Sequence, residues 1–145
     1  MWNFCGSSDI AKIERIQYRA LKFVYNDFTS SYSSLLQRAG LAKLELSRKR
    51  SIIVEVFKAV NNLSPGFMCD LFKPKHVKYN LRNKSQLCVT NSRTTRYGLQ
   101  SLSNYGARLW NSLPQHMKNC SDLLDFKTMV QSWTGSLCKC IFCRD

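Results

Sequence analysis

Apolar residues recur at steps of three and four along much of the chain, which predicts a mainly helical fold. The first such stripe predicts a helix that begins at Ser7 or Ser8 and runs to about Tyr25. Its apolar side comprises Ile10, Ile13, Ile16, Ala20, Val24 and Phe28. Its opposite side comprises the basic residues Lys12, Arg15, Arg19 and Lys22. Gln17 falls inside the apolar stripe, and we expect it to bond a neighbouring backbone group because a buried amide needs a partner.

A short second helix is predicted from Ser33 to Ala39, stopped by Gly40. A third is predicted from about Ser47 to Asn62. Its buried side comprises Ile52, Ile53, Val56, Phe57, Ala59 and Val60.

The third helix has an unusual beginning. Arg48, Lys49 and Arg50 crowd its first turn, where cations oppose the helix dipole. An external anion would offset this charge. If the helix instead begins nearer Leu44, most of the conflict disappears.

The middle of the chain predicts a small β element. Residues 63–66, Leu-Ser-Pro-Gly, end the third helix, and residues 67–72 form one more turn. Gln86 to Thr90 and Thr94 to Leu99 are rich in β-branched and aromatic residues, which predicts two short strands. We expect them to form a hairpin across residues 91–93.

The C-terminal third predicts a helical pair. Trp110 and Leu113 lie on a short helix closed by Pro114, because a residue before proline is disfavoured in the α region. Ser121 is the predicted N-cap of the last helix, with Asp122 in its first turn and Gly135 at its end. One side of this helix comprises Leu123, Phe126, Met129, Val130 and Trp133.

The expected fold class is therefore a small, mainly α domain with a short β-hairpin in the middle. Four segments follow from the pattern: an N-terminal helical segment (1–66), a basic linker with the hairpin (67–100), a C-terminal helical pair (101–135) and a Cys-rich tail (136–145). A chain of 145 residues with 44% hydrophobic residues is long enough for a core of its own. No apolar run approaches membrane-span length and no signal-peptide pattern opens the chain, so we expect an intracellular protein of nucleus or cytoplasm, neither secreted nor membrane-bound.

Charge is the strongest functional signal. The formal net charge is +13, and the segment from Leu71 to Ser121 contains nine Lys or Arg residues and no Asp or Glu. A solvated surface usually mixes both signs, so this bias indicates a polyanionic partner, RNA or DNA. The alternative is a generally basic protein with no specific ligand. The residues expected to contact phosphates are Lys73, Lys75, Lys78, Arg82, Lys84, Arg93 and Arg96, with Arg48, Lys49 and Arg50 as further candidates.

The tail is the best metal candidate. Cys138, Cys140 and Cys143 form a C-x-C-x-x-C cluster with spacing suited to a structural zinc ion, which a fourth ligand, Cys120 or His116, would complete. The alternative is a frayed, thiol-rich terminus. The sequence offers little support for catalysis. Neither His has a recognisable nucleophile partner, and Asp122, Asp125 and Lys127, which superficially suggest a metal nuclease, are better explained by the cap region and surface of the last helix.

The amino-acid sequence of the C-terminal third resembles that of a known family. GARLWNSLP (106–114), followed by LLDFK (123–127), resembles the region after the polymerase domain in reverse-transcriptase polyproteins of non-LTR retrotransposons, the LINE-like, jockey-related kind. Residues 13–36, 46–65 and 79–85 also resemble segments of that region, in the same order. The family's polymerase site uses two adjacent Asp residues, and no two of the six Asp residues here are adjacent. The resemblance therefore implies a fragment without the polymerase active site, not an enzyme by itself, that supports reverse transcription by binding nucleic acid. The alternatives are a docking module for the polymerase domain of the parent polyprotein, or a transposon remnant without function.

Overall fold

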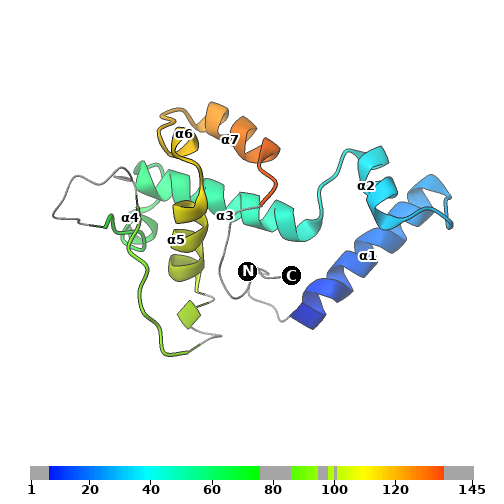
Figure 1. Ribbon diagram of the computed structural model, residues 1–145, viewed down its shortest axis with the longest axis horizontal. Coiled ribbons are helices and arrows are strands. Elements are labelled where there is room, and N and C mark those ends of the chain that lie inside the picture. Colours follow the sequence, from blue (N-terminus) through cyan, green and yellow to red (C-terminus); the bar gives the residue numbers. More distant parts are fainter. Residues whose placement is uncertain (1–6, 76–85, 95–97, 100, 136–145) are drawn as a thin grey trace. The chain divides into compact units, whose positions relative to one another are not determined.

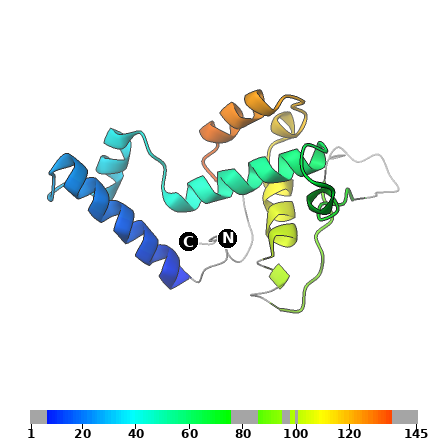
Figure 2. The ribbon, with the colours of Figure 1, turned by 180° about the vertical axis from the view of Figure 1, so that it is seen from behind.

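The computed structural model describes residues 7–75, 86–94, 98–99 and 101–135, and these are mainly helical, as predicted (Figure 1). The chain divides into two compact units, Met1–Arg48 and Lys49–Asp145. Each unit is described by itself below. The same elements are seen from behind in Figure 2.

The first unit is built on two helices, α1 (Ser7–Tyr25) and α2 (Tyr32–Ala39). Ser31 caps α2 by accepting a hydrogen bond from the Ser34 amide. Gly40 ends it in the left-handed conformation, with φ of 64°, which a residue with a side chain rarely adopts. The predictions of both helices and of the stop at Gly40 are confirmed.

The face that α1 buries differs from the predicted one. Leu21 packs with Leu35 and Leu36 of α2, surrounded by half-buried tyrosines. Ile16 and Val24, which belong to the predicted stripe, are 66% and 75% exposed. One short partner helix covers only a narrow strip of α1, so periodicity found the helix correctly but gave the wrong buried face.

Polar contacts also hold the first unit together. The Tyr32 hydroxyl donates to the Glu14 carboxylate, and the side-chain oxygen of Gln17 lies 2.6 Å from the same hydroxyl. Gln17 therefore meets a side chain and not the expected backbone group. Burial and the neighbouring Glu14 carboxylate raise the pKa of the Tyr32 phenol.

The third helix, α3 (Leu44–Val60), begins at the earlier of the two predicted positions. Glu45 lies in its first turn, where the dipole favours a negative charge. The other carboxylate oxygen of Glu14 accepts a hydrogen bond of 2.9 Å from the Glu45 amide, which satisfies one of the free amides of the helix start. The cations at 48–50 therefore lie beyond the first turn, and no external anion is needed to explain them.

The second unit has an aromatic core. The rings of Phe57 and Phe126 stack with centroids 4.0 Å apart and an interplanar angle of 17°. The Trp110 ring lies 6.4 Å from Phe57 and 6.1 Å from Phe126. The three side chains are at most 2% exposed and come from three different helices. They join α3 to α5 (Leu102–Ser112) and α7 (Leu123–Ser132), which lie across and beside it in Figure 1.

The remaining elements of this unit are the short helices α4 (Gly66–Cys69) and α6 (Gln115–Lys118). Helix α5 ends before Pro114, as predicted, but Leu113, which was expected on the helix, is its extended C-cap. The predicted cap of α7 is wrong by one residue. Asp122, not Ser121, accepts hydrogen bonds from two amides of the first turn, because a carboxylate offers acceptors and also complements the dipole.

The predicted β-hairpin is not present in the described part of the chain. Segment 86–94 contributes a single antiparallel bridge, between Leu87 and Pro74, and Gly98 and Leu99 lie in a helical turn. Residues 95–97 and 100 of the second predicted strand lie outside the described residues. The side chains of α5 take the place of a second strand, as the next subsection shows.

The crossing of α5 and α3 requires glycine at position 106. A Cβ atom there would lie 2.9 Å from a methyl of Val56 and 3.0 Å from the Phe72 ring, both of which are buried. We expect Gly106→Val to lower the free energy of unfolding by about 1–3 kcal/mol through overpacking. Urea denaturation, monitored by tryptophan fluorescence, measures this change in the free energy of unfolding. Gly66→Val is the matched control, because a Cβ at Gly66 meets nothing within 4 Å; equal effects of the two changes would contradict the prediction.

The hydrogen bonds in the turn after α1 should make the stability of this turn depend on pH. The Asp27 carboxylate accepts hydrogen bonds from the hydroxyl and amide of Ser30 and from those of Thr29. These bonds, led by the Ser30 hydroxyl, lower the pKa of Asp27 to about 2. The turn is therefore stabilised above the unfolded pKa of about 4 and loses this contribution as the pH falls towards 2. Carboxyl NMR titration should give a midpoint near 2 for Asp27, and a midpoint near 4 would contradict the structure.

Candidate nucleic-acid interface

Two predicted phosphate-binding lysines flank the β-bridge of the second unit. The Lys75 amide donates to the carbonyl of Gln86, and the Cys88 amide donates to the carbonyl of Lys73, both at 2.8 Å. Side chains alternate along an extended segment, so Lys73 and Lys75 project from the face opposite Leu87. Leu87 is 4% exposed whereas both lysines are exposed. The bridge therefore presents two ammonium groups side by side to solvent.

The partner segment is held by asparagine side chains of α5. Asn111 makes two bonds to Leu87: its amide nitrogen donates to the carbonyl at 3.0 Å, and its oxygen accepts from the backbone amide at 2.8 Å. Asn104, which is 1% exposed, donates to the Thr90 carbonyl at 2.8 Å and to the Ser92 hydroxyl at 3.1 Å. We call these two residues the asparagine clamp. They are seven residues apart, so both lie on one face of the helix.

The asparagine clamp holds the chain as far as Ser92, the residue before Arg93. Gly98 packs so closely on Ser92 that a Cβ atom at 98 would overlap it. The Leu99 amide donates to the Thr94 carbonyl at 3.0 Å. Arg93, between Ser92 and Thr94, is exposed. The described cations Lys73, Lys75 and Arg93 thus belong to one hydrogen-bonded assembly that α5 supports.

The other predicted phosphate contacts fall into two groups. Lys78, Arg82, Lys84 and Arg96 lie outside the described residues. Arg48, Lys49 and Arg50 are half-buried in α3, and all three have intramolecular partners. Arg50 donates twice to the Trp133 carbonyl, at 3.1 and 2.8 Å, and Arg48 donates to the Leu44 carbonyl at 3.2 Å. Their binding of nucleic acid stays a prediction.

Arg50 and Lys118 have structural contacts that the sequence did not reveal. Trp133 is the C-cap of α7, so the Arg50 guanidinium satisfies a carbonyl at a helix end. The Lys118 ammonium does the same for α5 by donating to the Asn111 carbonyl at 3.0 Å, and partial burial lowers the pKa of Lys118. The contact of Lys118 could have been predicted, because a cation that follows a helix often binds the last carbonyls of that helix. No feature of the sequence indicates that Arg50 contacts Trp133.

The proposed metal ligands are largely outside the described residues, since Cys138, Cys140 and Cys143 all are. Cys120 is half-buried and its thiol donates to the Asp122 carbonyl at 3.3 Å, while His116 is exposed. Within the described ranges, no three His, Cys, Asp or Glu residues come together as a metal site. The zinc site stays a prediction.

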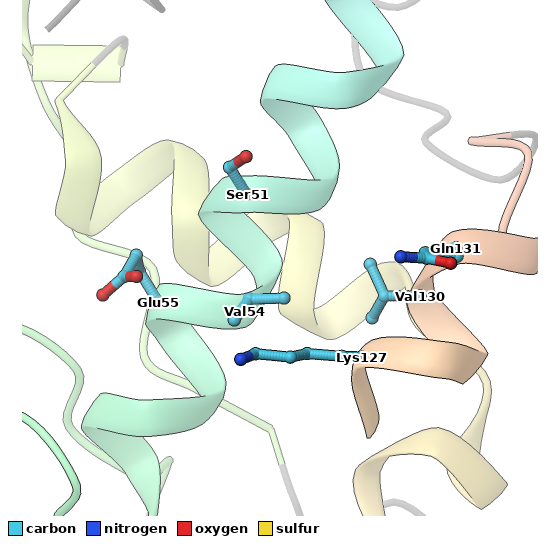
Figure 3. A pocket seen from close by; sticks show the side chains of 6 residues that line it. All are labelled: Ser51, Val54, Glu55, Lys127, Val130 and Gln131. Atoms are coloured by element: carbon cyan, nitrogen blue, oxygen red, sulfur yellow. The ribbon is translucent and has the colours of Figure 1, made fainter. Parts of the chain in front are cut away.

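A shallow groove of about 260 Å³ lies between α3 and α7 (Figure 3). Val54 and Val130 contribute its apolar lining, and Lys127 reaches across it towards α3. Glu55 on its rim already pairs with Lys58 at 2.8 Å. One paired carboxylate and one lysine supply neither a metal site nor a general acid–base pair, so the groove does not indicate catalysis.

No family model, no curated protein and no solved structure matches the chain. Among the described helices, none has the length and apolar character needed to cross a membrane. The candidate interface therefore rests on the residues and their geometry.

The asparagine clamp can be tested directly. Asn111→Ala removes both bonds to Leu87 and leaves its buried backbone groups without these partners, which should cost about 1–3 kcal/mol of stability. Amide hydrogen exchange at Leu87 and Cys88 should accelerate more than exchange in α7. Asn119→Ala is the control, because Asn119 is exposed and its side chain accepts a hydrogen bond from the Gln115 side chain four residues earlier. Unchanged protection at Leu87 in Asn111→Ala would contradict the clamp.

Proposed function

We propose that this protein binds nucleic acid through the phosphate backbone, with little discrimination of sequence. The observation that carries the proposal is the acid-free segment from Leu71 to Ser121, which contains nine cations. Three of them, Lys73, Lys75 and Arg93, are exposed on the assembly held by the asparagine clamp. Phosphate contacts of this kind supply most of the affinity of non-specific binding.

The hydrogen-bonded backbone around the β-bridge favours binding for a second reason. A cation on a free chain loses conformational entropy when it is fixed against a phosphate. Here the backbones of Lys73, Lys75 and Leu87 are already hydrogen-bonded, so only side-chain freedom remains to be lost at the two lysines. The ligand class is a polyanion, and RNA and single-stranded DNA both fit it.

We further propose that the chain corresponds to the region that follows the polymerase domain in a LINE-like reverse transcriptase. In that setting it would hold template RNA or target DNA beside the polymerase without catalysing a reaction itself. The support is the wording of GARLWNSLP and LLDFK. Gly106, Trp110 and Phe126 of these motifs are core residues, so the resemblance supports a shared fold more directly than a shared activity.

RNA binding across a salt series tests the first proposal. The variant Lys73→Ala/Lys75→Ala/Arg93→Ala should bind a labelled single-stranded RNA more weakly. Its log–log salt slope should be shallower by about 2, because each lost phosphate contact removes ~0.7 for a single strand.

The control carries the same loss of charge elsewhere. Lys12→Ala/Lys43→Ala/Lys127→Ala removes three exposed cations outside the acid-free segment and should leave the slope nearly unchanged. Equal slopes for the two triple variants would mean that net charge, and not this surface, drives binding. A folded wild-type chain that fails to bind at ~50 mM salt would exclude the proposed function.

A further inference from the structure

Helix α1 carries an apolar surface that the first unit leaves uncovered. Ile16, Phe23 and Val24 are 66%, 74% and 75% exposed, and Ala20 between them is also exposed. At 100° per residue these four side chains fall within an arc of about 100°. We call this arc the α1 ridge. Phe28 prolongs it beyond the helix, since its ring packs edge-on against Phe23 at 5.6 Å.

A row of cations borders the α1 ridge along one side. Lys12, Arg15, Arg19 and Lys22 occupy the neighbouring arc, on the side of Phe23. Arg15 and Arg19 are exposed, Lys12 pairs with Asp9 at 3.1 Å, and Lys22 lies over the Tyr18 ring. The other side of the ridge leads towards Leu21, where α2 packs. The ridge is therefore basic on one border and covered by protein on the other.

We propose that the α1 ridge docks into an apolar groove of another protein, and that carboxylates line one border of this groove. Anchors at positions i, i+4, i+7 and i+8 are those that a helix presents to a groove. A groove with an acidic border complements Arg15 and Arg19, which fixes the orientation of the helix. This inference does not depend on nucleic-acid binding, because it uses neither the bridge nor the asparagine clamp.

Charge and geometry disfavour the other occupants. In an antiparallel pair of two copies, each basic border would face the basic border of its partner, which repels. In a parallel pair, the basic border of one copy would meet the side on which α2 packs in the other. A helix that lies in a bilayer surface typically carries basic residues around a broad polar face, and here α2 occupies one edge.

The experiment uses the full chain and designed helical peptides as probes. One peptide carries a leucine stripe with glutamate along one border, a second replaces these glutamates with lysine, and a third scrambles the first. Fluorescence anisotropy should show binding of the glutamate-bordered peptide alone. Phe23→Ser/Val24→Ser should weaken it by about tenfold or more, as loss of central anchors does. Arg15→Ala/Arg19→Ala should weaken it less and remove most of its salt dependence.

Matched variants separate the α1 ridge from general stickiness. Phe67 and Leu124 are 70% and 69% exposed on other helices, so Phe67→Ser/Leu124→Ser should leave peptide binding unchanged. All these positions are exposed, so circular dichroism should confirm that each variant keeps its helices. The RNA salt slope should be the same in Phe23→Ser/Val24→Ser as in the wild type, which keeps this test independent of the proposed function.

Four results would overturn the proposal. The first is equal binding of the glutamate, lysine and scrambled peptides, and the second is binding that survives Phe23→Ser/Val24→Ser. The third is a dimer in sedimentation that these substitutions abolish, which would identify a second copy as the occupant. The fourth is α1-dependent pelleting with phosphatidylserine–phosphatidylcholine vesicles without peptide binding, which would identify a bilayer.

Discussion

The stacking of Phe57 on Phe126, with Trp110 against both, is the interaction on which the second unit depends. Each ring comes from a different helix, and burying three aromatic side chains supplies a large share of the apolar area available to so small a core. Since α5 and α7 touch α3 through these rings, the stack sets where α5 lies. The position of α5 in turn decides where Asn104 and Asn111 can reach, and hence where the chain from Leu87 to Ser92 runs.

The sequence predicted the elements better than their packing. Local signals placed α1, the stop at Gly40 and the end of α5 before Pro114, because capping and proline sterics act within a few residues. The buried face of α1 could not be found in the same way. Its sequence offers more apolar surface than α2 can cover, and only the tertiary arrangement selects Leu21 over Ile16. The hairpin prediction was wrong for a related reason. β propensity reports how well side chains suit a half-buried extended segment, not which partner the segment pairs with, and at Leu87 that partner is the Asn111 side chain of α5.

In the candidate interface, too, some features could be predicted from the sequence and others could not. The acid-free stretch, with Lys73, Lys75 and Arg93, was visible in the sequence because charge bias needs no structure to be counted. The distinction between cations that face solvent and cations that hold the fold was not visible. Arg50 reaches a carbonyl 83 positions later in the chain, and Lys118 holds the end of α5. Even in a strongly basic protein, a cation that binds a carbonyl at a helix end can therefore stabilise the fold instead of contacting a ligand. Such a cation attracts an anionic ligand only through its long-range electrostatic field.

The asparagine clamp has a further consequence for how this chain behaves in a crowded solution. An extended segment normally offers a row of free amides and carbonyls on each edge, and such an edge can recruit a strand from another molecule. Around Leu87 one edge is occupied by Lys73 and Lys75 through the bridge, and the other is occupied by Asn111. At this point the segment has no edge left to share. Leu87, in a segment of strong β propensity, is thereby kept extended, and a single amide side chain occupies the edge at which another strand could pair.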